Sequence, residues 1–102
     1  MNPKMQASRG RLTKMIEEHE STAGMYIRVY GDHLIAGRRE PTGPEGELED
    51  HDRVRFTRIN ATTFGLSVKR HNGRWERTPF SGPIQDMVDT VRTFMQHLVA
   101  PF

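Results

Sequence analysis

Positively charged side chains are concentrated between Arg53 and Arg77, where six arginines and one lysine accompany a single acidic residue, Glu76. Several of these cations alternate with apolar residues, as in residues 53–56 (Arg-Val-Arg-Phe). A period of two is typical of a β-strand with one buried face and one polar face. Guanidinium groups on such a face bind phosphates, carboxylates and aromatic rings. The pattern therefore predicts a positively charged sheet face, and it is the one indication of partner binding in the sequence.

An acidic block directly precedes this basic run. Residues 40–52 carry six carboxylates and no cation, so opposite charges are segregated along the chain. Two blocks of opposite charge attract two different partners, or they attract each other. The second interpretation requires no partner molecule, and it would leave the predicted face less positive than the count of arginines indicates.

Catalytic and metal-binding motifs are missing from the sequence. The five histidines are at least 14 residues apart, whereas paired zinc-binding histidines are separated by about three to five residues. Residues 49–52 (Glu-Asp-His-Asp) cluster oxygen and nitrogen donors, and a weak divalent-cation site is one interpretation of them. A solvated acidic loop is the simpler one, because the alternating ligands and central glycine of a calcium loop are missing. Neither a G-x-S-x-G elbow nor a glycine-rich phosphate loop occurs. We therefore expect no enzyme activity, no metal or cofactor, and no identifiable small-molecule ligand.

Length and composition indicate one small domain. The chain has 102 residues, of which 34% are hydrophobic, too few for two separate cores. We expect a flexible N-terminus at residues 1–7, a single domain at residues 8–102, and an acidic loop at residues 40–52. The absence of cysteine favours a reducing compartment, and no apolar run approaches the length of a membrane span, so we expect a cytoplasmic protein without membrane contact.

The first half of the domain is predicted to contain a helix and a hairpin. Residues 8–20 have apolar residues at helical spacing, with Ser8 as a plausible N-cap. Residues 25–30 alternate and predict a strand, and Gly31-Asp32 predicts a two-residue turn. This turn places Val29 opposite Leu34.

The second half is predicted to contain three further strands. Burial of Val54 and Phe56 with Leu66 requires an odd number of residues in the connection near residues 60–62. Asn72-Gly73 predicts a two-residue type I′ turn that sets Arg70 opposite Trp75. Lys69 would then oppose Glu76, and Trp75 would join the core side of the sheet.

The C-terminal segment predicts an amphipathic helix. Apolar residues recur at intervals of three and four from Ile84 to Phe102, after a Ser-Gly-Pro start at residues 81–83. We expect about four helical turns covering the sheet. The predicted fold is α+β, a single antiparallel meander of about five strands with an N-terminal and a C-terminal helix packed on one face.

The other face of the sheet, which we call the outer face, is the expected binding surface. The registers assign to it seven aromatic or cationic side chains: Tyr26, Arg28, Tyr30, Arg53, Arg55, Lys69 and Arg74. Three further arginines have the opposite parity and are expected at the margins of the core side: Arg58, Arg70 and Arg77. We select Tyr26, Arg28, Tyr30, Arg53 and Arg55 as partner-binding residues.

Three classes of function are compatible with this face. A small binding or assembly module would use tyrosine and arginine to engage a protein partner or a second copy as a homodimer. A single-stranded nucleic acid is the alternative, because cations and exposed aromatic rings also bind phosphates and bases. The third class is an enzyme or ligand-binding domain with a concave pocket that the sequence does not reveal.

Overall fold

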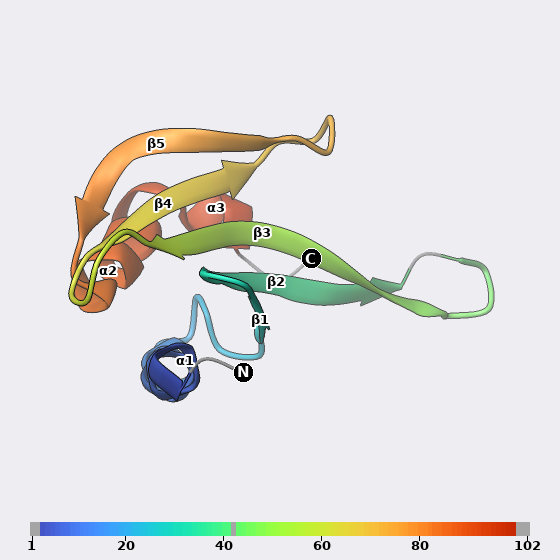
Figure 1. Cartoon of the computed structure of the whole chain (residues 1–102). Helices are drawn as coiled ribbons and strands as arrows, with labels where there is room; N and C mark the ends of the chain where they lie inside the picture. The colour runs from blue at the N-terminus through green and yellow to red at the C-terminus, as the bar shows by residue number, and fades with distance from the viewer. Residues whose placement is uncertain (1–2, 42, 100–102) are drawn as a thin grey trace.

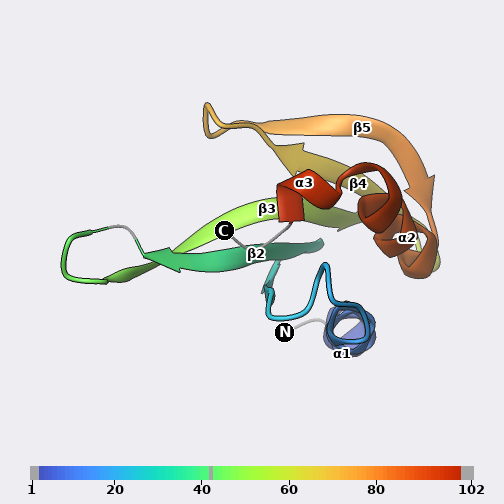
Figure 2. The ribbon, with the colours of Figure 1, turned by 180° about the vertical axis from the view of Figure 1, so that it is seen from behind.

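The computed structural model describes residues 3–41 and 43–99, which form an open five-stranded antiparallel sheet with helices on one face (Figures 1 and 2). The strands follow the order β1-β2-β3-β4-β5, each paired with its neighbour in sequence. The predicted α+β meander is confirmed. The elements are α1 (Pro3–Glu17), β1 (Tyr26–Tyr30), β2 (His33–Pro41), β3 (Leu48–Arg58), β4 (Phe64–Lys69), β5 (Trp75–Gly82), α2 (Ile84–Phe94) and α3 (Gln96–Val99).

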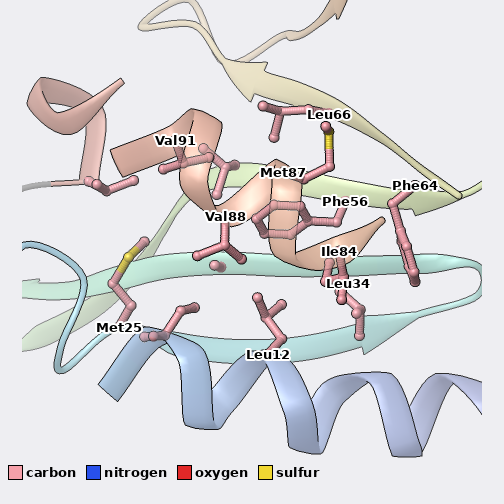
Figure 3. Packing of buried hydrophobic residues seen from close by; sticks show 14 of the residues in the cluster. Leu12, Met25, Leu34, Phe56, Phe64, Leu66, Ile84, Met87, Val88 and Val91 are labelled. Atoms are coloured by element: carbon pink, nitrogen blue, oxygen red, sulfur yellow. The ribbon is translucent and has the colours of Figure 1, made fainter. Parts of the chain in front are cut away.

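The core lies between the sheet and the helices. Figure 3 shows Leu34 and Phe56 of the sheet facing Val88 of α2, and Leu12 of α1 closes the same cluster. The residues of this cluster are spaced by two in the strands, as in Val54 and Phe56. In the helices they are spaced by three or four, as in Met87 and Val91, and both spacings agree with the sequence pattern. One apolar face of the sheet is therefore buried and the other is left uncovered by helices.

α1 begins earlier than expected. The predicted start at Ser8 is wrong: the helix begins at Pro3, so residues 3–7, expected to be a loose end, form its first turns. Met5 is completely buried, and Ser8 is buried in the middle of the helix rather than capping it. The guanidinium of Arg58 donates to Ser8 Oγ at 2.5 Å and lies 4.8 Å from the ring of Phe64. This contact holds the start of α1 on the core-side margin, where Arg58 was predicted.

The C-terminal segment is divided into two helices. α2 ends at Phe94, and Met95 leaves the helical conformation (φ −125°, ψ 22°) before α3 begins. The prediction of one continuous helix is thus wrong, and Phe102 lies outside the described residues. The change of direction brings the Val99 carbonyl to within 2.9 Å of Nε of Arg38, a buried side chain of β2. A hydrogen bond between β2 and α3, which the helical pattern does not reveal, accompanies the break.

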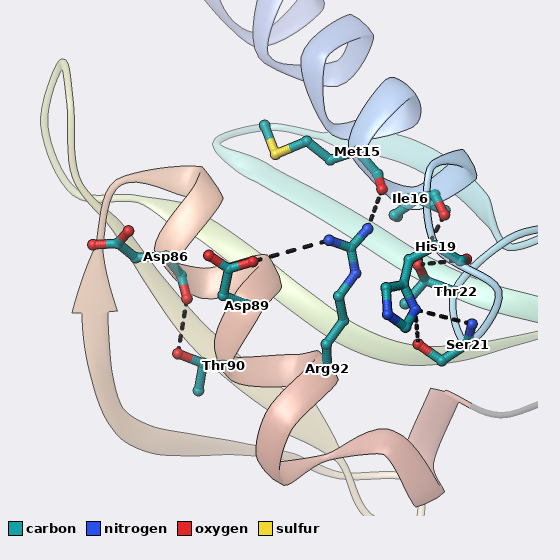
Figure 4. Close-up of polar contacts among 9 residues, drawn as sticks. All are labelled: Met15, Ile16, His19, Ser21, Thr22, Asp86, Asp89, Thr90 and Arg92. Atoms are coloured by element: carbon teal, nitrogen blue, oxygen red, sulfur yellow. Dashed lines mark hydrogen bonds and ion pairs between the residues drawn. The ribbon is translucent and has the colours of Figure 1, made fainter.

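α1 and α2 are joined by polar contacts as well as by apolar packing. Arg92 of α2 donates to the carbonyl of Met15 near the end of α1, and its other Nη lies 3.9 Å from Asp89 (Figure 4). Thr22, just after α1, is buried and donates to the Ile16 carbonyl at 2.8 Å. The two long helices therefore form one layer.

Two of the predicted connections are confirmed. Tyr30 pairs with His33, so Gly31-Asp32 is a two-residue turn. Gly31 has a φ of 58° and no described non-glycine residue has a positive φ, which corresponds to a type II′ turn. Arg58 pairs with Phe64, leaving a connection of five residues, an odd number as burial requires.

The turn at Asn72-Gly73 differs from the prediction by one residue. Arg70 N donates to Arg74 O at 2.9 Å, so the loop contains three residues, with Gly73 at a φ of 83°. The predicted type I′ turn is wrong because it needs positive φ at both central positions. Lys69 therefore pairs with Trp75, and Glu76 pairs with Val68. A one-residue change in register moves each β5 side chain to the other face.

The segment predicted to be an acidic loop is largely a pair of strands. β2 continues to Pro41 and β3 begins at Leu48, and beyond Gly37 they pair with each other as a two-stranded extension that we call the arm (residues 38–41 and 48–51). Ion pairs across it join Arg39 to Asp50, at 2.8 Å, and Arg53 to Glu40. These pairs balance carboxylates that would otherwise repel one another, which explains why so acidic a segment forms strands. The arm projects away from the rest of the molecule (Figure 1).

Candidate partner-binding face

One row of side chains crosses the outer face from edge to edge. The register aligns Arg28, Ile35, Arg55, Ser67 and Arg77 on five neighbouring strands. Ile35 is only 3% exposed although no helix covers it. Its cross-strand neighbours are Arg28 and Arg55, and arginine stems cover apolar surface while keeping the guanidinium in water. The row therefore presents guanidinium groups above a thin apolar layer.

Tyr26 and Arg28 are bound to Asp52. The Tyr26 hydroxyl donates to Asp52 Oδ1 at 2.5 Å, and Arg28 Nη2 donates to Oδ2 at 2.6 Å. Burial alone would raise the pKa of Asp52, but hydrogen bonds from Arg28 and Tyr26, with the charges of Arg28 and Lys69, hold it below its usual value. Burial and the hydrogen bond to Asp52 raise the pKa of Tyr26, which remains a neutral donor. Two predicted binding residues are thus engaged within the chain.

Gly37 makes room for the Tyr26 ring. A Cβ at this position would collide with the His51 carbonyl and with the Tyr26 hydroxyl. Glycine lets the ring cross the strand and reach Asp52, and the register shifts at this point. The irregularity is a β-bulge in which Gly37 pairs with Asp52 and Arg53 is the additional residue.

The bulge displaces Arg53 from the outer face. Ala36 pairs with Val54 and Gly37 pairs with Asp52, so strict alternation fails at Arg53. The Arg53 guanidinium binds Glu40, whose parity is that of the buried Arg38 on the helix side. The prediction that Arg53 and Arg55 share the outer face is therefore wrong for Arg53.

Trp75 joins the outer face instead of the core. The guanidinium carbon of Arg55 lies 4.8 Å from the indole centroid, and Lys69 Nζ lies 5.4 Å from it. Both distances are within the range of cation–π attraction. The predicted pair between Lys69 and Glu76 is wrong: Lys69 is 3.8 Å from Asp52, and Glu76 binds Arg70 at 2.8 Å. The register change exchanges two arginines as well. Arg77 moves to the outer face, and Arg74 lies opposite Arg70 on the helix side.

Arg55 and Arg77 are the cations of the outer face that lack a carboxylate partner among the described residues. Arg28 and Lys69 share Asp52, whereas no ion pair joins Arg55 or Arg77 to any described carboxylate, and Arg55 Nε is buried without a hydrogen-bond partner. The two arginines flank Ser67, so their backbones are two strands apart, about 10 Å. Their guanidinium groups are therefore available to an anionic ligand.

A shallow hollow lies between these two arginines. Its volume is about 440 Å³, and Thr57, Ser67 and Ser81 are among the residues that line it. Ile59 and Phe80, both exposed, contribute an apolar rim. We call this feature the Arg55–Arg77 hollow. Its chemistry suits a ligand that carries both carboxylates and an apolar side chain.

Tyr30 and His33 form a second aromatic element at the end of the sheet. Their rings are stacked with centroids 6.5 Å apart, and Tyr30 is 68% exposed. His33 Nδ1 lies 2.8 Å from Thr57 Oγ1. Burial, followed by the positive charge of Arg55, lowers the pKa of His33, so its ring is neutral near pH 7. Tyr30 is thus an exposed ring beside the Arg55–Arg77 hollow, on the face where it was predicted.

A larger hollow of about 830 Å³ is lined by residues of the arm, of the β4–β5 hairpin and of α3, and it reaches Asp52 and Lys69. Several of its charged groups are paired: Arg53 with Glu40, Arg70 with the neighbouring Glu76, and His51 within 3.9 Å of Glu49. Among the described residues no group of three or more histidines or carboxylates is arranged to hold a metal ion. The lysine and the arginines that line this hollow thus each have a carboxylate partner, whereas Arg55 and Arg77 of the outer face have none among the described residues.

The site residues that sequence reasoning missed are Trp75, Arg77 and Asp52. A two-residue turn at Asn72-Gly73 predicts the wrong face for Trp75 and Arg77, because the loop contains three residues. The acidic, breaker-rich composition of residues 40–52 predicts a loop at Asp52, which lies in β3. Gly37 was the available signal for the bulge, because a glycine inside a strand pattern indicates a bulge or a close backbone approach.

Comparisons with known proteins give no relative from which a function could be transferred: no family model, no curated protein and no solved structure matches the chain. Within the part of the chain that is described, no helix is both long and apolar enough to cross a membrane.

Proposed function

We propose that this protein is a small, non-enzymatic cytoplasmic binding module whose outer face engages an acidic protein partner, including a second copy of itself. The absence of cysteine supports the compartment. The observation that carries the proposal is the pair Arg55 and Arg77. They flank a hollow with an apolar rim and have no carboxylate partner among the described residues. A guanidinium group without a carboxylate partner can form a charge-assisted, often bidentate pair with an incoming carboxylate.

The arrangement of Trp75 supports the same proposal. Arginine and tryptophan are the residues most enriched where binding energy is concentrated in protein interfaces. Arg55 and Lys69 both contact the Trp75 ring, and these contacts restrain its orientation before a partner arrives. A side chain that is already ordered loses less entropy on binding.

A peptide titration tests this proposal. The probe is a fluorescein-labelled peptide of alternating glutamate and leucine, held at low concentration while the protein is added. We expect its anisotropy to rise with the full-length protein, whereas a lysine–leucine peptide of the same length should not respond. Added salt should weaken binding, because the surface charges are screened.

Two charge-reversal variants make the titration specific. Arg77→Glu should weaken peptide binding about tenfold or more, the cost of reversing one charge at a charge-complementary contact. Arg9→Glu makes the same change of charge at an exposed position of α1, which belongs to the helix layer and not to the outer face, and should bind like the parent protein. Equal weakening by both variants, or no binding at low salt, would contradict the proposal.

Single-stranded nucleic acid is the second candidate. The exposed Tyr30 ring and the cation-flanked Trp75 favour it, because bases stack on such rings while cations bind phosphates. A labelled oligothymidine titrated at two salt concentrations distinguishes this candidate. Tight binding that decreases steeply with salt and exceeds that of the acidic peptide would favour nucleic acid over protein.

A further inference from the structure

We propose that the partner is a second copy of this chain, and that the tip of one copy's arm occupies the Arg55–Arg77 hollow of the other. The arm tip comprises residues 43–48. This inference rests on the proposed function, because it names the partner that the outer face binds. It follows from features that lie at opposite ends of the same molecule.

The charges of the arm tip match those of the hollow. Glu45 and Glu47 are exposed, and neither forms an ion pair with a described residue. The nearby carboxylates Glu40 and Asp50 are already bound to arginines of the arm and its base. Two free carboxylates at the tip thus correspond to the two free guanidinium groups, Arg55 and Arg77.

The apolar side chains match as well. Leu48, next to Glu47, is 64% exposed at the base of the tip. Ile59 and Phe80, on the rim of the hollow, are also exposed, at 61% and 36%. Contact between Leu48 and this rim would remove apolar surface from water on both sides. Such a contact adds affinity that a purely electrostatic pair of surfaces does not have.

The contact must form between two molecules. Leu48 and Thr57 belong to the same strand, β3, and nine steps along it span about 30 Å. The tip and the hollow of one chain are therefore held apart by an extended strand. Because the separation is the same in both copies, two chains placed antiparallel bring each tip to the other's hollow. This arrangement is a closed two-fold dimer.

The two strands of the arm receive little support from the rest of the chain, so contact with a partner would stabilise them. Residues 38–41 pair with residues 48–51 and with no other described strand. An isolated two-stranded hairpin is only marginally stable in water. Docking on the outer face of a second copy would cover one side of the arm and give its two strands contacts with a third strand or side-chain surface that they lack in the single chain.

Sedimentation equilibrium of the full-length chain tests this inference. We expect a reversible dimer whose dissociation constant increases with salt concentration. A tip variant, Glu45→Arg with Glu47→Arg, and a hollow variant, Arg55→Glu with Arg77→Glu, should each self-associate at least about tenfold more weakly. The single variant Arg77→Glu changes only an exposed residue and should also weaken the dimer. It shows that the weaker association of the double variant does not result from misfolding caused by the Arg55 substitution.

Mixing the two variants is the decisive step. The reversed tip of one is complementary to the reversed hollow of the other, and both remaining surfaces keep their original charges. An equimolar mixture should therefore form a heterodimer although each variant alone is monomeric. As a matched control, Glu18→Arg with Glu20→Arg reverses two exposed charges just after α1 and should leave the dimer unchanged.

The outcomes separate this inference from the proposed function. A parent protein that stays monomeric at all concentrations, or a mixture that does not form the heterodimer, overturns the arm-to-hollow contact. If that monomer still binds the glutamate–leucine peptide through Arg77, the outer face remains a binding surface for another acidic partner. Failure of both measurements overturns the inference and the proposed function together.

Discussion

Asp52 is the residue that joins the largest number of polar side chains on the outer face. Its carboxylate accepts hydrogen bonds from Tyr26 and Arg28 and lies 3.8 Å from Lys69. By engaging these groups, it leaves Arg55 and Arg77 as the charges that remain available. Together with the ion pair between Arg53 and Glu40 and the register of β5, this carboxylate reduces a broad basic patch to two available guanidinium groups beside one hollow.

Replacement of Asp52 by asparagine should lower the free energy of unfolding by about 2 kcal/mol near pH 7, because hydrogen bonds to a charged group are lost. The pKa of Asp52 is lower in the folded protein than its usual value of 3.8. Its contribution is therefore fully present above that value and is lost as the pH falls through the folded pKa. Urea denaturation at pH 7 and at pH 2 measures both effects. The difference between Asp52→Asn and the parent should shrink at low pH, and a constant difference would contradict this role.

Gly37 is the residue that allows Tyr26 to reach Asp52. Gly37→Ala should destabilise the fold by about 2 kcal/mol or more, because the new Cβ collides with backbone and with an aromatic ring that cannot move freely. Gly10→Ala is the matched control: a Cβ there meets nothing within 4 Å in α1, and the change should stabilise the protein by about 0.5 to 1 kcal/mol. Thermal unfolding of both variants checks the pair. Equal effects would show that the close approach at Gly37 is unimportant.

At the scale of elements, the hairpins show what the sequence can and cannot specify. Gly31-Asp32 was predicted correctly because a glycine followed by a polar residue, between strands with matching apolar sides, leaves one acceptable register. Asn72-Gly73 carried an equally strong signal, yet a two-residue and a three-residue loop both use a glycine with positive φ. Burial does not distinguish the two loop lengths, because Trp75 and Arg77 can be placed on either face of the sheet without leaving an apolar core position unfilled.

The candidate site was predictable only in part, for the same reason. Arg55 and Tyr30 follow directly from strand alternation and lie where they were expected. Arg53 required knowledge of a bulge, and Arg77 required the exact length of a turn. Both depend on one residue of register, which apolar periodicity specifies for buried positions and leaves open for charged ones.

The arm is the element whose behaviour should depend most on association. Its amides at residues 39, 40, 49 and 50 should exchange with solvent much faster than those of Val54 and Phe56 in dilute protein, because few contacts hold the arm beyond the buried Arg38. At high concentration, or with the partner chain bound, exchange at the same amides should slow. Hydrogen exchange at two protein concentrations measures this change. Arm amides that are equally protected at both concentrations would indicate an arm that is stable by itself.

At the scale of the whole molecule, the long axis separates opposite charges. The chain measures 44 × 29 × 27 Å, and the arm projects at one end (Figure 1). The Arg55–Arg77 hollow is lined by Thr57, about 30 Å along β3 from Leu48. A net charge of only +2 conceals this polarity. Such a distribution favours oriented association, since potentials at the two ends attract opposite surfaces.

The central claim is that the free arginines of the outer face form the binding surface. Chemical-shift mapping with the glutamate–leucine peptide tests it most directly, using isotope-labelled full-length protein at low salt. We predict shifts of the amides of Arg55, Ser67 and Arg77 and of the Trp75 indole, with α1 and α2 unaffected. Shifts confined to His51, His97 and the other residues of the larger hollow, or no shifts at all, would contradict this prediction.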